Sequence, residues 1–517
     1  IVSLGITSST RIGVIVPNET INLKVSMSAN LPPLASDTFM RCQLKTEAFF
    51  VPSRLLAGAY EEWLTGSKIK QQGAQDYDSR LPSLEIVAAS SACTGPGSLA
   101  DYLGYKYIGS PYTPGGEISA LPFIAYHKIW DDWYRNPLIT NSCFEKAYTS
   151  SASVPATQLK KIKYAPSVTY ASDALARYQL TSSNTDLTLA DGKNLWQLRQ
   201  RNFGADYFTT ATPDAQNGVA QSVSFDVPLT GDSAGNGNFT IAALRAANSM
   251  QQFLERNNIA GSRMVDYVRA HYGANLSDAI AQRSVLLGSA AFDVYSKGIY
   301  QTSNTSGNTN NPFDGSVGAQ FGSAYASGSD FIIKGFTAME PGYIFVMTTL
   351  VPKVTYSTGV RRYLTHYVGA GSVTDMANPI LQNVGNQPIF SYELNGNLSG
   401  SSVFGYTDRY AEFKTMEDEL HGLLRDGQSL ESFALQRSFP STYTAGITSS
   451  FLEIPTNYLN QVTAVNSSVS TYGVWIDSYM DYKVSMPLAQ YSIPSLQDPA
   501  YEHGEDVIVQ RGGKSLN

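Results

Sequence analysis

Four segments with strong β-strand patterns are spread along the chain, and their separation constrains the fold more than any other feature. Residues 20–29, 40–50 and 472–488 alternate apolar and polar side chains, whereas residues 342–356 are almost continuously apolar, as in a central strand. Segments so far apart can share one core only if the residues between them are excursions from a single antiparallel sandwich. We therefore predict a mainly β protein, a single eight-stranded antiparallel jelly roll with large inserted loops and helices.

The strand at residues 40–50 changes character at its end. Its buried face is expected to carry Met40, Cys42, Leu44, Thr46, Ala48 and Phe50. Its solvated face is expected to carry Arg41, Gln43, Lys45 and Glu47. Pro52 should end the strand because it has no N–H to donate, and apolar residues three to four apart then predict a helix through Tyr60 and Trp63.

The residues between the strands are expected to be insertions within one domain, residues 1–517. They are residues 51–139 (helices and loops), 140–195 (a surface protrusion), 241–288 (helical) and 301–329 (a polar loop), followed by a C-terminal extension at 497–517. In the helical insertion, Gly261 interrupts an apolar stripe and Gly273 is placed as a C-terminal cap. Residues 301–329 are too polar and too rich in glycine to pack a core.

Composition limits the function. Only 15 % of the residues are charged, 43 % are hydrophobic, and 32 are tyrosines. Such a surface suits burial against copies of the same chain, because interfaces favour aromatic residues and disfavour Lys and Glu. A net charge of −7 excludes a chain that binds nucleic acid through bulk electrostatics. The three cysteines lack metal-site spacing, and we expect no metal, disulfide framework or cofactor. The sequence has no apolar run of about 18 residues, so we expect no membrane span.

Signals for catalysis are weak. None of the sequence signatures of zinc proteases, serine hydrolases or phosphate-binding loops occurs. Glu412 and Glu417 with His421 as general base could be proposed as a carboxylate site, against the alternative of ordinary ion pairs in a solvated segment. Acidic residues at 131, 132 and 145 suggest a hard-cation site, against the alternative of paired acids on a loop.

Two clusters could bind ligands. The basic cluster Lys160, Lys161 and Lys163 could face DNA through phosphate contacts, or it is an exposed loop kept soluble by its lysines. The rings of Trp130, Trp133 and Tyr134 could form a sugar platform, although such rings more often anchor a core or a subunit contact.

Six blocks, in order, resemble the major capsid protein of Microviridae, the small icosahedral single-stranded-DNA phages, and most closely its gokushovirus-like branch. The blocks are "FFVPSRLL…YEEWLTG" (49–66), "LPFIAYHKIWDDWYRNPLI" (121–139), "RQRNFGADYFTTATPDAQNG" (199–218), "FLERNNIAGSRMVDYVRAHYGANLSDAIAQR" (253–283), "GYTDRYAEFK…HGLLRD" (405–426) and "YKVSMPLAQYSIPSL" (482–496). Asp214 and Asn217 depart from the family pattern, which often has Trp and Lys there.

The resemblance implies a bacteriophage structural protein and not an enzyme. It implies a viral-capsid jelly roll that self-assembles into a T=1 icosahedral shell around circular single-stranded DNA, with loops at 140–195 and 301–329 as candidates for host attachment. The implied partners are the chain itself, the encapsidated DNA, a host cell-surface receptor, and three proteins of the same phage: a small basic DNA-binding protein, an internal scaffolding protein and a pilot protein. The implied location is the virion, after assembly in the host bacterial cytoplasm.

For such a shell, the expected subunit contacts lie in aromatic and charged clusters of the matching blocks. The candidate interface residues are Tyr60, Trp63, Trp130, Trp133, Tyr134, Tyr406, Arg409, Tyr410, His421 and Arg425. About sixty copies at −7 each carry about −420 in total, so DNA containment is expected to need a basic partner or small cations. The alternatives are a secreted carbohydrate-binding β-sandwich protein and a glycoside-processing enzyme using Glu412 and Glu417.

Overall fold

A computed structural model gives the fold of the chain. It describes residues 7–8, 13–56, 60, 83–86, 97–105, 116–144, 177–179, 189, 191, 193, 195, 197–217, 241–260, 263–278, 280, 282–300, 320–365, 377–400, 402–464, 474–486 and 507–510. The strands are β1 (Thr7–Ser8), β2 (Gly13–Ile15), β3 (Thr20–Asn30), β4 (Cys42–Pro52), β5 (Ser83–Ile86), β6 (Gly116–Ser119), β7 (Arg177–Gln179), β8 (Val285–Tyr300), β9 (Gln320–Thr337), β10 (Gly342–Pro352), β11 (Gln387–Phe390), β12 (Val403–Thr407), β13 (Trp475–Met486) and β14 (Val507–Gln510).

Helices are shorter and lie mainly between the strands. The α-helices are α3 (Leu99–Tyr102), α4 (Leu121–Ile129), α6 (Ile241–Ala260), α7 (Met264–Tyr272), α8 (Arg362–Thr365), α9 (Tyr392–Asn395) and α10 (Ser449–Leu452). The short 3-10 helices are η1 (Ser53–Leu55), η5 (Leu381–Val384), η6 (Leu398–Gly400), η7 (Ala411–Phe413), η8 (Gly422–Leu424), η9 (Glu431–Phe433) and η10 (Tyr458–Gln461). A π-helical turn, η2 (Trp130–Tyr134), continues α4. No described helix is long and apolar enough to cross a membrane.

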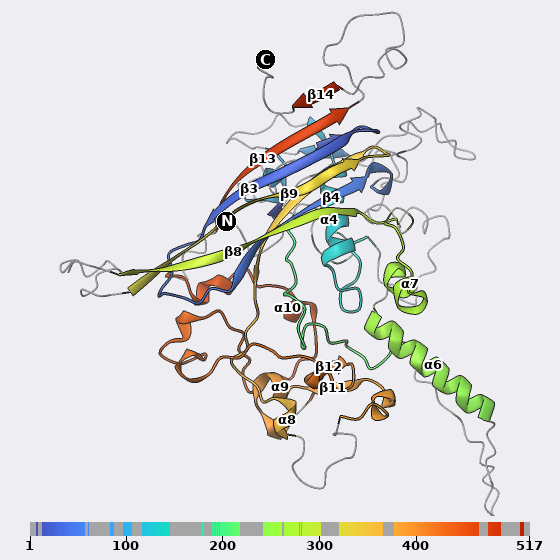
Figure 1. Cartoon of the computed structure of the whole chain (residues 1–517), viewed down its shortest axis with the longest axis vertical. Helices are drawn as coiled ribbons and strands as arrows, with labels where there is room; N and C mark the ends of the chain where they lie inside the picture. Colours follow the sequence, from blue (N-terminus) through green and yellow to red (C-terminus); the bar gives the residue numbers. More distant parts are fainter. Residues whose placement is uncertain are drawn as a thin grey trace, which may run out of the picture.

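The main sheet of the described chain is antiparallel and contains nine strands. Its order is β1-β10-β4-β8-β9-β3-β13-β14, with β2 also paired to β10. The long strands run side by side across the upper half of the molecule (Figure 1). β8 changes partner along its length, because residues 285–293 pair with β4 and residues 294–300 pair with β9. The change of partner lets the sheet curl, so that its two halves face each other.

Contacts across the curl define the first core. The rings of Phe50 on β4 and Phe336 on β9 have centroids 5.2 Å apart. The hydroxyl of Thr46 on β4 donates to the sulfur of Met27 on β3 at 2.8 Å, although these strands are not neighbours in the sheet. Alternating residues of β3 (Ile21, Leu23, Val25 and Met27) are buried in this core, as their parity predicts. The fold is therefore mainly β and compatible with a jelly roll carrying inserted helices.

A second core covers the opposite face of β4 and β10. All of the last seven residues of β4 are buried, so the strand has no solvated face there. Phe50 faces the first core, whereas Phe49 packs in the second with α4 and η2. The sequence prediction for Glu47 was wrong: it is 6 % exposed, because η2 and residue Arg201 cover it.

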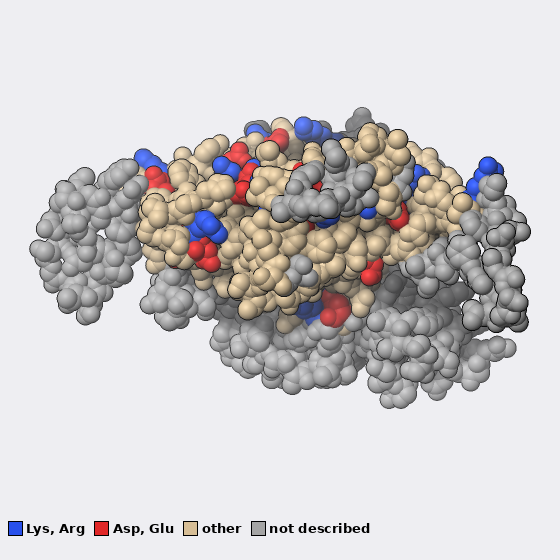
Figure 2. Space-filling view, turned by 90° about the horizontal axis from the view of Figure 1, so that it is seen from below, with Lys and Arg blue, Asp and Glu red and all other residues tan. Residues whose placement is uncertain are grey.

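A third core lies below the sheet and is built from residues 207–211 and 354–452. β11 and β12 form a two-stranded sheet there, beside α8 and α9 (Figure 1). The residues buried in it include Tyr207, Tyr356 and Phe404. Seen from this side, the described surface is mostly uncharged, and many of its few charged groups lie in pairs of opposite sign (Figure 2).

Several local expectations are confirmed and one boundary moves. The helical region splits into α6 and α7, and Gly273 ends α7 with a positive φ of 64°. Cys42 is a buried, unpaired thiol. Residues 320–329, which polar composition assigned to a loop, are instead the first part of β9. The continuation of the helix through Trp63, most of 140–195, and the loop 301–319 lie outside the described residues.

Candidate assembly surface

The insertion formed by α4 and η2 is held to the sheet by a buried carboxylate. Tyr134 donates a 2.5 Å hydrogen bond to Oε2 of Glu47, and Nη1 of Arg201 donates to the same oxygen at 2.7 Å. Lys45 lies 2.6 Å from the other oxygen. Burial raises the pKa of Glu47, but Arg201, Lys45 and the Tyr134 hydrogen bond outweigh it, so the pKa lies below its ordinary value. Glu47 therefore remains an ionised clamp inside the subunit.

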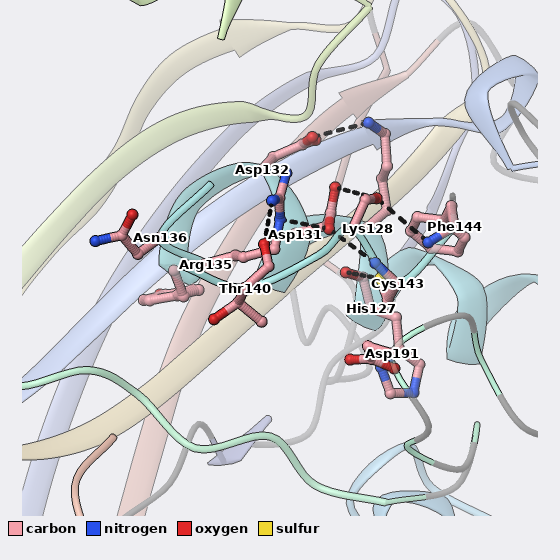
Figure 3. Close-up of polar contacts among 12 residues, drawn as sticks. His127, Lys128, Asp131, Asp132, Arg135, Asn136, Thr140, Cys143, Phe144 and Asp191 are labelled. Carbon is pink, nitrogen blue, oxygen red and sulfur yellow. Dashed lines mark hydrogen bonds and ion pairs between the residues drawn. The ribbon is translucent and has the colours of Figure 1, made fainter. Parts of the chain in front are cut away.

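Asp131 and Asp132 are saturated by partners in the chain. Lys128 pairs with Asp132 at 2.8 Å, and Arg135 pairs with Asp131 at 2.8 Å (Figure 3). Asp131 also accepts from the backbone of Cys143, and Asp132 accepts from Ser284 at the start of β8. These carboxylates therefore fasten η2 to neighbouring segments, and no cluster of metal-binding side chains occurs within the described residues.

On α4, His127 joins a second buried polar group. Its Nε2 lies 2.7 Å from the carbonyl oxygen of Leu195, and Nε of Arg199 donates to its Nδ1 at 2.9 Å. Arg199 also pairs with Asp191. Burial, with the neighbouring Arg199 charge, holds the pKa of His127 well below its ordinary value. The imidazole is therefore neutral and serves as a structural link.

The aromatic residues expected at subunit contacts are mostly enclosed by the chain. Tyr60, Trp130 and Tyr134 are buried in the second core. Trp133 is partly buried, donates to the carbonyl of Ser284 at 3.0 Å, and has the Arg283 guanidinium 3.5 Å from a ring centroid. These rings fix the shape of the subunit from inside, while Trp63 lies outside the described residues.

The expected contact residues from block 405–426 have mixed positions. Tyr410 is buried in a left-handed conformation, and the backbone of Tyr406 pairs with Thr212. Arg409 donates to the carbonyl of Gly385 at 3.0 Å, and Arg425 donates to that of Ser357 at 2.8 Å.

The side chain of His421 is 82 % exposed, and Arg425 is exposed as well. Nε2 of His421 lies 3.5 Å from a carboxylate oxygen of Glu419. His421 and Arg425 are therefore the accessible members of the expected contact residues in the described block 405–426. The DNA-facing candidates Lys160, Lys161 and Lys163 are outside the described residues.

The carboxylates considered for catalysis border a small cavity in the third core. The cavity has a volume of about 40 Å³, and its lining includes Glu412, Glu417, Arg361 and Arg362. Arg362 lies 3.6 Å from Glu412, and Arg361 pairs with Glu419. Because these arginines neutralise two of the acids, the arrangement fits an internal ion-pair network.

Exposed apolar side chains are concentrated in residues 361–423, which we call the 361–423 surface. They are Tyr363, Leu364, Ile380, Val384, Leu398, Val403, Phe413, Met416 and Leu423. Met416 is 87 % exposed and Ile380 is 79 % exposed. Sequence analysis missed this surface because the segment has no regular period that would mark an outward face. Exposed apolar residues that form a patch are typical of protein contacts, which makes this segment the candidate contact surface.

Comparisons with known proteins find capsid proteins along most of the chain. The model of the family "Capsid protein (F protein)" matches residues 6–496. The chain is 26 % identical to capsid protein VP1 of Chlamydia phage 1, over 93 % of this chain and 91 % of that protein. It is 26 % identical to capsid protein VP1 of Bdellovibrio phage phiMH2K, over 93 % and 90 %, and 24 % identical to capsid protein VP1 of Spiroplasma virus 4, over 87 % and 85 %.

The fold and the matches together define a structural protein of a virus particle. The chain belongs to the capsid protein (F protein) family of Microviridae phages, as the six sequence blocks predicted.

Proposed function

We propose that this chain is the major capsid protein of a T=1 icosahedral particle, in which about sixty identical copies enclose a circular single-stranded DNA genome. Membership of the capsid family supports self-association into a shell. The protein acts by assembly: many weak contacts add up because each subunit is held by several neighbours at once. It requires no reaction and no cofactor.

The observation that carries this proposal is the 361–423 surface. The three cores bury the inward apolar residues of the sheet and its insertions, whereas this surface exposes nine large apolar side chains. A neighbouring copy would cover them at little electrostatic cost, since this side of the molecule carries few charges (Figure 2). A stable contact should bury on the order of 1,000 Å² or more.

Genome containment adds a requirement. The chain has a net charge of −7, so about sixty copies contribute about −420 and repel DNA in bulk. We therefore assign charge neutralisation to small cations and to basic proteins of the same phage, with scaffolding and pilot proteins assisting assembly and delivery. The segments 140–195 and 301–319 are the candidates for contact with a host receptor.

The test places one charge in the 361–423 surface. Met416→Glu should abolish or strongly reduce spherical particles in electron microscopy while leaving the unassembled chain folded by circular dichroism. Met339→Glu is the matched control, because Met339 is 88 % exposed but lies outside this surface. Normal particles from Met416→Glu together with none from Met339→Glu would refute the assignment of this surface. Absence of any particle from the unmodified chain with its phage partners would refute the proposed function.

A further inference from the structure

The outer face of the sheet half formed by β9, β3 and β13 differs from every other exposed surface of the described chain. We include the part of β8 paired with β9, residues 294–300, and call this the aromatic sheet face. Its inward side packs the first core. Its exposed large side chains are Tyr295, Ile299, Tyr325, Phe331, Trp475 and Tyr479, which are 46–70 % exposed.

Strand register arranges these rings around a polar strip. Trp475 lies opposite Asn30 on β3, which in turn lies opposite Tyr325 on β9. Tyr325 contacts Tyr295 of β8, with ring centroids 6.1 Å apart. Two strand spacings, about 9.6 Å, therefore separate Trp475 from Tyr325, and Tyr295 lies one strand further.

The next outward row, formed by Asp477, Ser28 and Ser327, carries no ring, and the two rows after it carry one ring each. Tyr479 lies opposite Ser26, which exchanges a 2.8 Å side-chain hydrogen bond with Ser329. One row further along, the Lys24 ammonium lies 5.5 Å from the centroid of the Phe331 ring. The centre of the face thus carries short hydroxyl and amide side chains, and rings stand along both sides of it.

The kind of apolar residue separates this face from the 361–423 surface. Five of its six exposed large hydrophobic residues are aromatic, whereas seven of the nine on the 361–423 surface are aliphatic or Met. Aliphatic side chains offer no planar face on which a base could stack. Rings with hydroxyl and amide groups between them can stack on planar bases and hydrogen-bond their edges.

Charge favours the same occupant. The outward residues of the aromatic sheet face include four lysines (Lys24, Lys297, Lys334 and Lys483) and three aspartates (Asp330, Asp477 and Asp481), which gives +4 − 3 = +1. The whole chain carries −7. This face therefore carries no net negative charge that would repel DNA phosphates, although the chain as a whole is acidic. Bases can stack on its rings without that repulsion.

We propose that the aromatic sheet face binds single-stranded DNA by stacking bases on Trp475, Tyr479, Phe331 and the Tyr295 and Tyr325 pair, which makes it the genome-facing side of the subunit. The inference rests on the proposed function, because it names the part of the shell protein that meets the genome. Stacking carries the affinity, and only about four lysines are near phosphates, so binding should weaken only modestly with added salt.

The experiment measures fluorescence anisotropy of a labelled 20-nucleotide oligothymidylate titrated with the full, unassembled chain. Tyr479→Ala and Phe331→Ala should each weaken binding by about tenfold, since one stacked base contributes roughly five- to 150-fold. Tyr363→Ala is the matched control, because Tyr363 is a ring with 48 % exposure on the 361–423 surface. It should leave oligothymidylate affinity unchanged.

Particle formation by the same variants separates this inference from the proposed function. If the unmodified chain forms particles but Tyr479→Ala and Phe331→Ala bind oligothymidylate normally, the inference is wrong and the proposed function stands. If those variants bind normally and fail to form particles, the face is a contact between copies, which also overturns the inference. If the unmodified chain binds oligothymidylate through these rings but forms no particle with its phage partners, the proposed function fails instead.

Discussion

The phenol of Tyr134 and the carboxylate of Glu47 meet at 2.5 Å between the inserted turn η2 and the strand β4. Both side chains are nearly inaccessible, at 8 % and 6 % exposure. The hydrogen bond thus joins an insertion to the sheet in the interior, where Arg201 and Lys45 balance the carboxylate charge. The insertion and the sheet are consequently one packed unit.

Tyr134→Phe should destabilise the unassembled chain by about 1–3 kcal/mol. The ring still fills its site, but Glu47 loses one of its donors while remaining buried and charged. Urea unfolding followed by circular dichroism measures the change. Tyr479→Phe is the control, because Tyr479 is 70 % exposed and should change stability by less than about 0.5 kcal/mol. Equal stability of the two variants would contradict the role of the Tyr134 hydroxyl.

Glu47 shows where sequence reasoning reached its limit. Alternation correctly predicted the buried faces of β3 and β4, because the side-chain period of a strand is two and one face must meet the core. The same alternation assigned Glu47 to solvent, because a pattern within one strand carries no information about a layer added on its other face. That layer comes from α4 and η2, about eighty residues further along the chain.

The aromatic clusters illustrate the same limit at the candidate site. Trp130 and Tyr134 were expected to meet neighbouring copies, but the second core encloses both. Conversely, Trp475 and Tyr479 share the outward parity of Asp477, so the strand pattern itself could have marked them as exposed rings. Exposure of Met416 could not have been found this way, because its segment has no regular structure.

Glu393 makes the third core sensitive to pH. Burial raises its pKa to about 7, although the backbone N–H of Phe390, the Arg362 charge and the Tyr207 hydroxyl all act in the opposite direction. A carboxyl whose pKa is raised on folding stabilises the fold below its unfolded pKa, near 4.5, and that stabilisation is lost as the pH rises through 7. The unmodified chain should therefore gain about 2–3 kcal/mol from this group between pH 8 and pH 5.

Glu393→Gln tests this dependence because it cannot titrate. Urea unfolding at pH 5, 6, 7 and 8 should show that the difference in stability between the unmodified chain and the variant changes by about 2–3 kcal/mol across the range. Tyr207→Phe should move the midpoint of the pH dependence upward, since the Tyr207 hydroxyl donates to Oε2 of Glu393 at 3.0 Å. A stability difference independent of pH would show that Glu393 does not titrate in this range.

His127 should produce the opposite pH dependence. Its pKa lies well below 6.5 in the fold because burial and the Arg199 charge oppose protonation, so stability is present above pH 6.5 and is lost as the pH falls below it. The loss between pH 7.5 and 5.5 should be on the order of 1 kcal/mol. His127→Gln keeps an acceptor for Arg199 and a donor for Leu195 but does not titrate, so it should remove this loss in urea unfolding. The same loss in His127→Gln would assign it to other groups.

Gly288 is required where the curled sheet closes. A Cβ atom at this position would lie 2.1 Å from the carbonyl oxygen of Ile332, a backbone atom of β9 that cannot rotate away. Gly288→Ala should therefore force the two halves of the sheet apart and cost on the order of 3 kcal/mol or more in urea unfolding.

Gly298→Ala is the matched control for that closure, on the same strand. There the added Cβ would lie 2.9 Å from a carboxylate oxygen of Asp37, the end of a side chain that can move. Its cost should be about 1 kcal/mol or less, because the sheet need not separate. Particle yield should follow the same order, since a subunit whose sheet halves separate cannot keep its contact surfaces in register. Equal losses in the two variants would mean that the close approach of β8 to Ile332 does not set the stability of the sandwich.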